Sequence, residues 1–274
     1  MPELPEVETI KRTLTPLLMG KKISQVNTIR EDVIKHPQAK QFVQEITDRN
    51  IVNLSRRGKY LTITFADGNR LVVHLRMTGR MLYCSPLDEQ KPHTHVIFGL
   101  SDGNELRFSD VRRFGCLWLL ESMEEDCCTG MVKLGPEPFD EQFCPQYLAD
   151  LLAKKKTTIK QALLDQRVLA GLGNIYTDEV LFRAAMHPQM ICSQISLLKV
   201  QKIVIAVRAV LTEAIQHKGT TFRDYLDGMG EKGAHQLALF VYQREGELCR
   251  VCKTPIQRIK VAGRSTFFCP NCQK

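Results

Sequence analysis

Four cysteines near the C-terminus constrain the fold of this chain more than any other feature. Two residues separate Cys249 from Cys252 and Cys269 from Cys272, and sixteen residues lie between the two pairs. This spacing is typical of a zinc ribbon, in which two short knuckles close a tetrahedral site of four thiolates. Four protein ligands leave no open coordination position. We therefore expect one structural Zn²⁺ per chain, and disulfide pairing is the alternative.

The segment that carries these cysteines has one sign of charge. From Cys249 to the end there are six Lys and Arg residues and no Asp or Glu. The whole chain is also basic, with a formal net charge of +8. A hairpin of this charge, held by a metal ion, is typical of a finger that contacts DNA, because phosphates attract clustered cations.

The sequence has no feature of a membrane or secreted protein. No segment reaches the roughly 18 uninterrupted apolar residues of a membrane span. The acidic, proline-broken N-terminus does not match a secretory signal. We expect a cytoplasmic protein, which disfavours disulfides. Six of the ten cysteines lie outside the quartet, including the adjacent Cys127 and Cys128, and are expected to be free thiols.

The first half of the chain has the two-residue period of β-strands. Residues 22–120 look like strands, and 61–65 alternate cleanly. Asp-Gly pairs at 67–68 and 102–103 lie between apolar runs, as hairpin turns require. A helix is expected over 9–19, bent or ended early by Pro16. We predict a β-rich N-terminal domain over 1–133.

The second half has helical periodicity. The Leu-Gly-Pro-Glu-Pro stretch at 134–138 breaks regular structure, so we place a linker at 134–146. Apolar residues then recur at helical spacing, which predicts a helical domain over 147–244 and the zinc finger over 245–274. The expected helices are 147–153, 159–165, 175–183 and 197–217.

A glycine-containing turn lies inside the expected helical domain. Gly171 and Gly173 allow tight turns with positive φ, and Asn174 suits the N-cap of a helix that begins at Ile175. Backbone amides at such a helix start can bind a phosphate. The alternative is an ordinary turn between two helices.

The N-terminal string Met-Pro-Glu-Leu-Pro-Glu-Val-Glu indicates amine chemistry. Once Met1 is removed, Pro2 has a secondary amine, and α-amino groups titrate near pH ~8, so part of the amine is a neutral nucleophile at cellular pH. Attack on a sugar carbon would give an iminium ion. Glu3 and Glu6 supply carboxylates for proton transfer. The alternative is that Pro2 only blocks a flexible terminus.

The N-terminal string, the turn at 166–176 and the cysteine quartet together resemble the bacterial formamidopyrimidine-DNA glycosylases, and the resemblance covers the whole chain. It implies an α+β fold, with an N-terminal β-sandwich domain and flanking helices, then a helix-two-turn-helix domain carrying the zinc ribbon. It also implies a monomeric, bifunctional DNA glycosylase and AP lyase of base excision repair. The substrate would be double-stranded DNA containing an oxidised purine, bound in a basic cleft between the domains.

The resemblance also implies residue roles. Pro2 forms a Schiff base with the sugar and Glu3 protonates the opening sugar ring. Lys59, in an Arg-Arg-Gly-Lys stretch, assists β-elimination, and Arg264 at the finger tip assists δ-elimination. Without the resemblance, residues 56–60 would be interpreted as a solvated turn.

Further positions match DNA-contacting loops of the same family. Met77, Arg112 and Phe114 would fill the space left by an extruded base, because apolar and aromatic side chains restore stacking and an Arg can donate to the orphaned base. His93, Lys155 and Asn174 would contact phosphates. By themselves, Met77 would be interpreted as a core residue, Phe114 as a strand residue and the Lys run at 154–156 as a solvated face.

Two positions depart from the family pattern. Gly233 is followed by Ala234 and His235, whereas relatives usually carry an aromatic residue at the second of these positions. Gln243 replaces the usual glycine after Tyr242, so lesion preference is less constrained than catalysis. An endonuclease VIII-like enzyme for oxidised pyrimidines is one alternative. A zinc-ribbon DNA-binding protein without catalysis and a damage sensor without turnover are the others. Leu4 and the three intercalating residues favour the purine enzyme.

Overall fold

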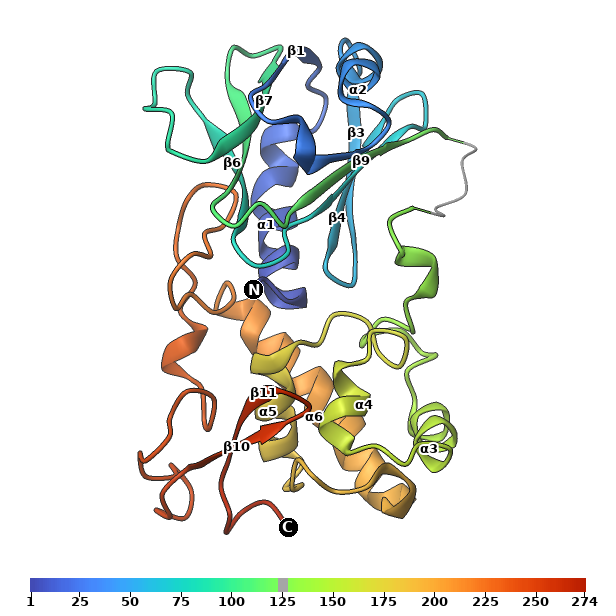
Figure 1. Cartoon of the computed structure of the whole chain (residues 1–274), viewed down its shortest axis with the longest axis vertical. Helices are drawn as coiled ribbons and strands as arrows, with labels where there is room; N and C mark the ends of the chain where they lie inside the picture. The colour runs from blue at the N-terminus through green and yellow to red at the C-terminus, as the bar shows by residue number, and fades with distance from the viewer. Residues whose placement is uncertain (123–127) are drawn as a thin grey trace. The chain divides into compact units, whose positions relative to one another are not determined.

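The computed structural model describes residues 1–122 and 128–274, which form two compact units. The N-terminal unit comprises Met1–Val132 and His217–Gln236, and the C-terminal unit comprises Lys133–Gln216 and Leu237–Lys274 (Figure 1). Sequence patterns placed 217–236 in the helical domain. In the structure this segment packs with the N-terminal unit, because its backbone N–H groups donate to side chains of the first helix.

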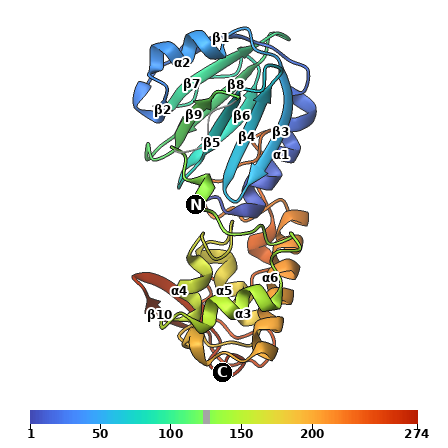
Figure 2. The same ribbon diagram turned by 90° about the vertical axis from the view of Figure 1, so that its right-hand side faces the viewer.

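The N-terminal unit contains two sheets, with strand orders β1-β7-β8-β6 and β2-β9-β5-β4-β3 (Figure 2). All pairings are antiparallel except β2 with β9. The strands are β1 (Ile23–Thr28), β2 (Ile34–His36), β3 (Ile51–Arg57), β4 (Tyr60–Phe65), β5 (Arg70–His74), β6 (Gly79–Cys84), β7 (Thr94–Leu100), β8 (Glu105–Asp110) and β9 (Cys116–Leu120).

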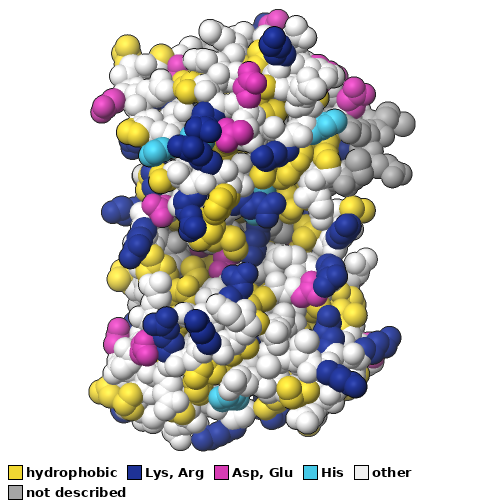
Figure 3. All heavy atoms as spheres, in the orientation of Figure 1, with side chains coloured by type: hydrophobic (Ala, Val, Ile, Leu, Met, Phe, Trp, Pro, Cys, Tyr) yellow, Lys and Arg dark blue, Asp and Glu magenta, His cyan; other side chains and the backbone are white. Residues whose placement is uncertain are grey.

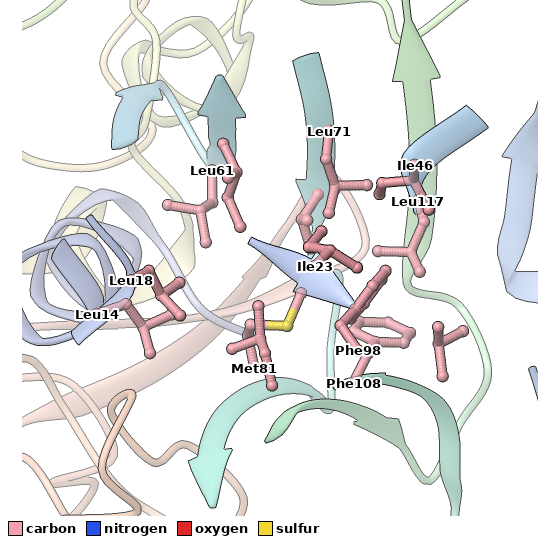
Figure 4. Packing of buried hydrophobic residues seen from close by; sticks show 14 of the residues in the cluster. Leu14, Leu18, Ile23, Ile46, Leu61, Leu71, Met81, Phe98, Phe108 and Leu117 are labelled. Atoms are coloured by element: carbon pink, nitrogen blue, oxygen red, sulfur yellow. The ribbon is translucent and has the colours of Figure 1, made fainter. Parts of the chain in front are cut away.

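The expected β-sandwich is confirmed by a core that both sheets share. Leu61 and Leu71 come from one sheet, Phe98 and Phe108 from the other, and all four are buried in one cluster (Figure 4). Burial of side chains this large stabilises a fold by roughly 1.5–3 kcal/mol each. Both expected Asp-Gly hairpins are confirmed, since they join β4 to β5 and β7 to β8.

Helix α1 (Leu4–Leu18) begins earlier than the predicted 9–19. A capping box between Glu3 and Glu6 starts it, and Pro5 is tolerated in the first turn, where its missing N–H is not needed. Pro16 lies inside the helix and does not end it before Leu18. The buried stripe of α1 packs against β3, β4 and β6 (Figure 1).

The predicted run of strands is wrong at the 3₁₀ helix Glu31–Val33 and, over a longer segment, at a second α-helix. Residues Ala39–Ile46 form helix α2, which buries Phe42 and Ile46 in the core of the N-terminal unit. The apolar spacing of four residues between them is helical, but the segment is too short for its period to be distinguished from neighbouring strands.

The C-terminal unit is helical and ends in a hairpin. The four predicted helices are confirmed to within two residues, and they are followed by an antiparallel pair of strands. The elements are α3 (Pro145–Ala153), α4 (Ile159–Leu164), α5 (Asn174–Arg183), α6 (Leu197–Gln216), β10 (Gln257–Val261) and β11 (Arg264–Phe268). Short 3₁₀ helices are Glu31–Val33, Met131–Lys133, Cys192–Gln194 and His235–Leu237.

Among the helices that the structure describes, none has the length and apolarity to cross a membrane. The cytoplasmic location stays a prediction. Lys and Arg side chains are spread over the face seen in Figure 3, in keeping with the basic sequence.

Candidate functional site

The N-terminal turn is fixed by the carboxylate of Glu6. Its Oε2 accepts the backbone N–H of Glu3 at 2.8 Å, and its Oε1 accepts the backbone N–H of Thr220 at 2.7 Å. Pro2, Glu3 and Glu6 are all buried. The first residues of the chain are therefore held against the segment 217–236 instead of forming a loose end.

Lys59 lies in the turn between β3 and β4 and is buried. Gly58 before it has a φ of +55°, which a glycine adopts without a steric cost. Arg56 Nη1 donates to the Gly58 carbonyl at 3.1 Å, and Arg56 Nε donates to Glu8 Oε2 at 3.0 Å. The turn that carries Lys59 is thus joined to α1, the helix that follows Pro2 and Glu3.

The Glu8 carboxylate remains charged at this junction. Burial acts to raise its pKa, but hydrogen bonds from Lys11, Arg12 and Arg56 outweigh burial and hold the pKa below its usual range. The charged carboxylate can therefore hold Arg56 throughout the neutral pH range.

The predicted intercalating residues lie on two loops of the N-terminal unit. Met77 lies between β5 and β6 with 39% of its surface exposed, and Phe114 lies between β8 and β9 with 51% exposed. The Arg112 guanidinium lies 5.1 Å from the centroid of the Phe114 ring. Such exposure suits side chains that enter a DNA duplex better than it suits core residues.

His74 fixes the start of the first loop. Its Nδ1 accepts the backbone N–H of Arg76 at 3.0 Å, and Arg76 has a φ of +52°. Burial lowers the pKa of His74 to about 3, with the charges of Arg76 and Lys59 acting in the same direction. The ring is therefore neutral at pH 7 and keeps the lone pair that the Arg76 amide needs.

The glycine turn in the C-terminal unit differs from the expectation in two details. Asn174 is the first residue of α5 and not its cap, and Gly173 occupies the cap. Gly173 has a φ of −130°, so it does not adopt the expected positive φ. Gly171 has the expected positive φ of +93°. The Gln166 side chain, which sequence patterns did not single out, binds both the Gly171 N–H at 3.0 Å and the Leu172 carbonyl at 2.7 Å.

Asn174 and a buried ion pair together hold the finger strand β11. Asn174 Nδ2 donates to the Ser265 carbonyl at 2.9 Å. Lys160 Nζ donates to the same carbonyl at 3.2 Å and to Asp178 at 2.7 Å, while Asp178 accepts the Phe267 N–H at 3.0 Å. Nothing in the local sequence reveals this pair, because Lys160 and Asp178 lie on different helices.

Arg264, next to Ser265, is thereby placed at the tip of the hairpin. It is exposed and lines an open hollow of about 580 Å³ in the C-terminal unit. Asn174, Gln243 and Arg258 also line the hollow. Lys155, the other predicted phosphate contact of this unit, has its Nζ 3.7 Å from Asp165.

The four C-terminal cysteines form a site suited to a metal ion. Their sulfur atoms all lie within 4.8 Å of one another, with Cys252 Sγ 3.4 Å from Cys269 Sγ and Cys249 Sγ 3.9 Å from Cys272 Sγ. Tetrahedral zinc with Zn–S bonds of about 2.3 Å separates its sulfur ligands by about 3.8 Å. The cluster therefore fits one structural Zn²⁺.

Four of the cysteines outside the quartet are free thiols, as expected. They are Cys84, Cys116, Cys144 and Cys192. Cys127 lies outside the described residues.

Both units of the chain contain segments that match models of known protein families. Family models match the formamidopyrimidine-DNA glycosylase N-terminal domain at 1–117, its H2TH domain at 134–225 and a zinc finger found in FPG and IleRS at 246–274. The formamidopyrimidine-DNA glycosylase of Pelotomaculum thermopropionicum is 45% identical over 274 residues, covering 100% of this chain and 99% of the relative. The chain belongs to the formamidopyrimidine-DNA glycosylase family. It is therefore an enzyme, a DNA glycosylase with a structural zinc finger.

Further members of the formamidopyrimidine-DNA glycosylase family are similar to this chain over nearly their whole length. The enzyme of Desulforamulus reducens is 47% identical over 275 residues, covering 100% of this chain and 99% of its own. A Lactococcus lactis FPG mutant, solved in complex with Fapy-dG-containing DNA, has a TM-score of 0.91 at 36% identity, with all of both chains covered. MutM (FPG) from Thermus thermophilus has a TM-score of 0.89 at 37% identity, covering 99% of this chain and 98% of that one.

The predicted site residues divide between the two units. Eight lie in the N-terminal unit: Pro2, Glu3, Glu6, Lys59, Met77, His93, Arg112 and Phe114. Lys155, Asn174, Arg264 and the four zinc ligands lie in the C-terminal unit. The catalytic and DNA-binding roles of these residues stay predictions.

Proposed function

We propose that this enzyme is a bifunctional DNA glycosylase and AP lyase that removes oxidised purines from double-stranded DNA. The match of the whole chain to formamidopyrimidine-DNA glycosylases carries the proposal. The Lactococcus lactis relatives solved with Fapy-dG and with abasic-site DNA favour this substrate class. We expect one chain to act on one lesion as a monomer.

In the proposed first step, the Pro2 nitrogen attacks the anomeric carbon of the damaged nucleotide. The bond to the base breaks, and the base leaves with the bonding electrons. Glu3 protonates the sugar ring oxygen as the ring opens, which produces an iminium ion. The hydrogen bond from the Glu3 N–H to Glu6 supports this assignment, because it limits where the N-terminal residues can move.

In the proposed lyase steps, the iminium ion acidifies the adjacent sugar carbon. Loss of a proton there expels the 3′ phosphate by β-elimination, assisted by Lys59, and a second elimination expels the 5′ phosphate, assisted by Arg264. The product is a one-nucleoside gap flanked by phosphates. The position of Lys59 supports its role, because Arg56 joins the buried turn that carries Lys59 to α1, the helix that follows Pro2 and Glu3.

The proposed DNA contacts come from both the N-terminal and the C-terminal unit. Met77, Arg112 and Phe114 replace the extruded nucleotide in the duplex. His93 in the N-terminal unit, and Lys155 and Asn174 in the C-terminal unit, bind phosphates. The structural zinc keeps the hairpin that carries Arg264 folded and takes no part in the chemistry.

Oxidised pyrimidines are a second candidate substrate class. A wild-type Lactococcus lactis relative, 35% identical to this chain, has been solved with DNA containing an oxidised pyrimidine. The amine chemistry would be the same for both classes, so only the lesion preference separates these two proposals.

Borohydride trapping tests the function and the lesion class together. The protein, with Met1 shown to be absent by mass spectrometry, is incubated with three duplexes that contain oxidised guanine opposite cytosine, an oxidised pyrimidine, or no damage. A covalent adduct on the guanine lesion that Pro2→Gly abolishes is expected. An adduct on the pyrimidine lesion alone would move the enzyme to the endonuclease VIII-like class. No adduct on any duplex would leave a DNA-binding protein or a damage sensor.

A further inference from the structure

We propose that Asp110 is a positioning residue that holds three DNA-contacting loops together as one rigid wedge. The inference rests on the proposed function, because the loops carry four of the predicted DNA contacts. These are Met77, His93, Arg112 and Phe114. Asp110 is the last residue of β8, with 1% of its surface exposed, and it pairs with Gly79 at the start of β6.

The first loop is tied to Asp110 through Thr78, the residue after Met77. Thr78 Oγ1 donates a hydrogen bond to Asp110 Oδ1. The backbone N–H of Arg112 lies 3.1 Å from Thr78 Oγ1 and 3.1 Å from Asp110 Oδ1. One carboxylate oxygen and one hydroxyl therefore join the loop of Met77 to the loop of Arg112.

The other carboxylate oxygen holds the far end of the second loop. Asp110 Oδ2 accepts the Gly115 N–H at 2.7 Å, so the carboxylate spans the segment that carries Arg112 and Phe114. A Cβ at Gly115 would lie 2.7 Å from the Phe108 ring and 3.1 Å from Asp110 Oδ2. The close approach of the loop to the carboxylate thus requires glycine.

The backbone of Asp110 holds the third loop. Its N–H donates to the His93 carbonyl at 3.0 Å, and its carbonyl lies 2.7 Å from Nε2 of His95. A carbonyl can only accept, so His95 carries its proton on Nε2. Asp110 therefore binds residues on both sides of Thr94, where β7 begins.

Backbone strain in all three loops makes such a hub necessary. Arg76, His93 and Arg113 have φ values of +52°, +67° and +60°, in a region that residues other than glycine rarely adopt. Strained backbone persists only where the surrounding contacts determine it, and it is common at sites that must be preorganised. A wedge that unstacks a base has this requirement, because a mobile side chain would be displaced by the stacked bases instead of inserting between them.

The hydrogen-bond pattern also predicts which substitutions break the hub. Both oxygens of Asp110 accept bonds, so Asp110→Asn places an NH₂ group against either the Gly115 N–H or the Thr78 and Arg112 donors. Thr78→Val removes the hydroxyl with little change in shape. Thr78→Ser keeps the hydroxyl and is the matched control.

The first experiment separates base extrusion from chemistry. Stopped-flow fluorescence of 2-aminopurine beside the lesion reports extrusion from a duplex, and borohydride trapping on a single-stranded abasic oligonucleotide reports the amine step without a wedge. We expect Thr78→Val and Asp110→Asn to slow extrusion at least tenfold while trapping stays within twofold of wild type. Thr78→Ser should match wild type in both. An unchanged extrusion rate in Thr78→Val, or an equal loss in both assays, would overturn the proposal.

The second experiment does not depend on activity. Hydrogen exchange of the DNA-free protein is compared at the Gly115 amide, which binds Asp110 but not Thr78. We expect at least fivefold faster exchange at Gly115 in Thr78→Val and wild-type exchange in Thr78→Ser. If the exchange rate of the Gly115 amide were the same in Thr78→Val as in wild type, the loops would be independent and the proposal would be refuted. If wild type excises no lesion, the proposed function fails while this measurement still decides the coupling. The Thr78 variants keep the test available should Asp110→Asn fail to fold.

Discussion

Glu6 and Thr220 lie 214 positions apart in the sequence, and the Thr220 N–H donates to Glu6 Oε1 at 2.7 Å. The other oxygen of Glu6 accepts the Glu3 N–H. One carboxylate therefore links the N-terminal turn to the segment 217–236. An amide side chain could satisfy only one of these two N–H donors.

Glu6→Gln should consequently destabilise the protein by about 1–3 kcal/mol, because one buried N–H loses its partner. Equilibrium denaturation measures the loss, and limited proteolysis should show faster cleavage within 217–236. Glu231→Gln is the control, since the Glu231 partner Lys218 lies on the surface of the same segment. If Glu6→Gln and Glu231→Gln were equally stable, the Glu6 carboxylate would not be the group that holds the segment 217–236 in place.

Gln243→Gly should stabilise the protein by about 0.5–1 kcal/mol. Gln243 has a φ of +59°, a conformation that costs a side-chain-bearing residue more than glycine. The gain is limited because glycine loses more backbone entropy on folding. Urea denaturation measures it, with Gln257→Gly in strand β10 as a control expected to lose stability. A loss of stability in Gln243→Gly would contradict the argument from backbone strain.

Acid should destabilise the protein through His74. The folded pKa of about 3 lies below the ordinary value of 6.5, so the unfolded state binds the proton first as the pH falls. The stability contributed by the neutral ring is complete above pH 6.5 and is lost as the pH falls from there towards 3. The slope contributed by this group approaches about 1.4 kcal/mol per pH unit.

A variant without a titrating ring isolates this contribution. His74→Asn keeps an acceptor for the Arg76 N–H, so its stability should depend less on pH between 6.5 and 5. Denaturation at several pH values measures the slope. An unchanged slope in His74→Asn would show that this histidine is not the responsible group.

Removal of zinc should unfold the finger and weaken DNA binding at least tenfold, since ribbon folding is coupled to the metal. Cys269→Ser should have the same effect as a chelator. Zinc content and duplex affinity are measured together. Cys192→Ser, at a buried thiol outside the quartet, should keep its zinc and its affinity. Full affinity in the zinc-free protein would exclude a role for the finger in binding.

Much of this fold could be predicted because it is encoded locally. The period of the apolar residues located the four helices of the C-terminal unit, and the Asp-Gly pairs located two hairpins. The start of α1 was missed because Pro5 was interpreted as a break in regular structure. Glu3 and Glu6, which form the capping box, were interpreted only as groups for proton transfer. Helix α2 was missed because it is short.

The contacts that organise the candidate site could not be predicted in the same way. Asp110 binds Thr78, 32 residues away, and Lys160 binds the Ser265 carbonyl, 105 residues away. Such pairs depend on tertiary structure, so no local pattern marks them. The motifs identified the candidate site residues, whereas most of the residues that hold them in place became visible only in the fold.

The division of the chain also bears on the order in which the protein is synthesised. The N-terminal unit includes His217–Gln236, so it is incomplete when residue 132 leaves the ribosome. The intervening 84 residues of the C-terminal unit, Lys133–Gln216, must be translated before Thr220 can reach Glu6. The turn that carries Pro2 is therefore among the first segments to be made and among the last to acquire its final contacts.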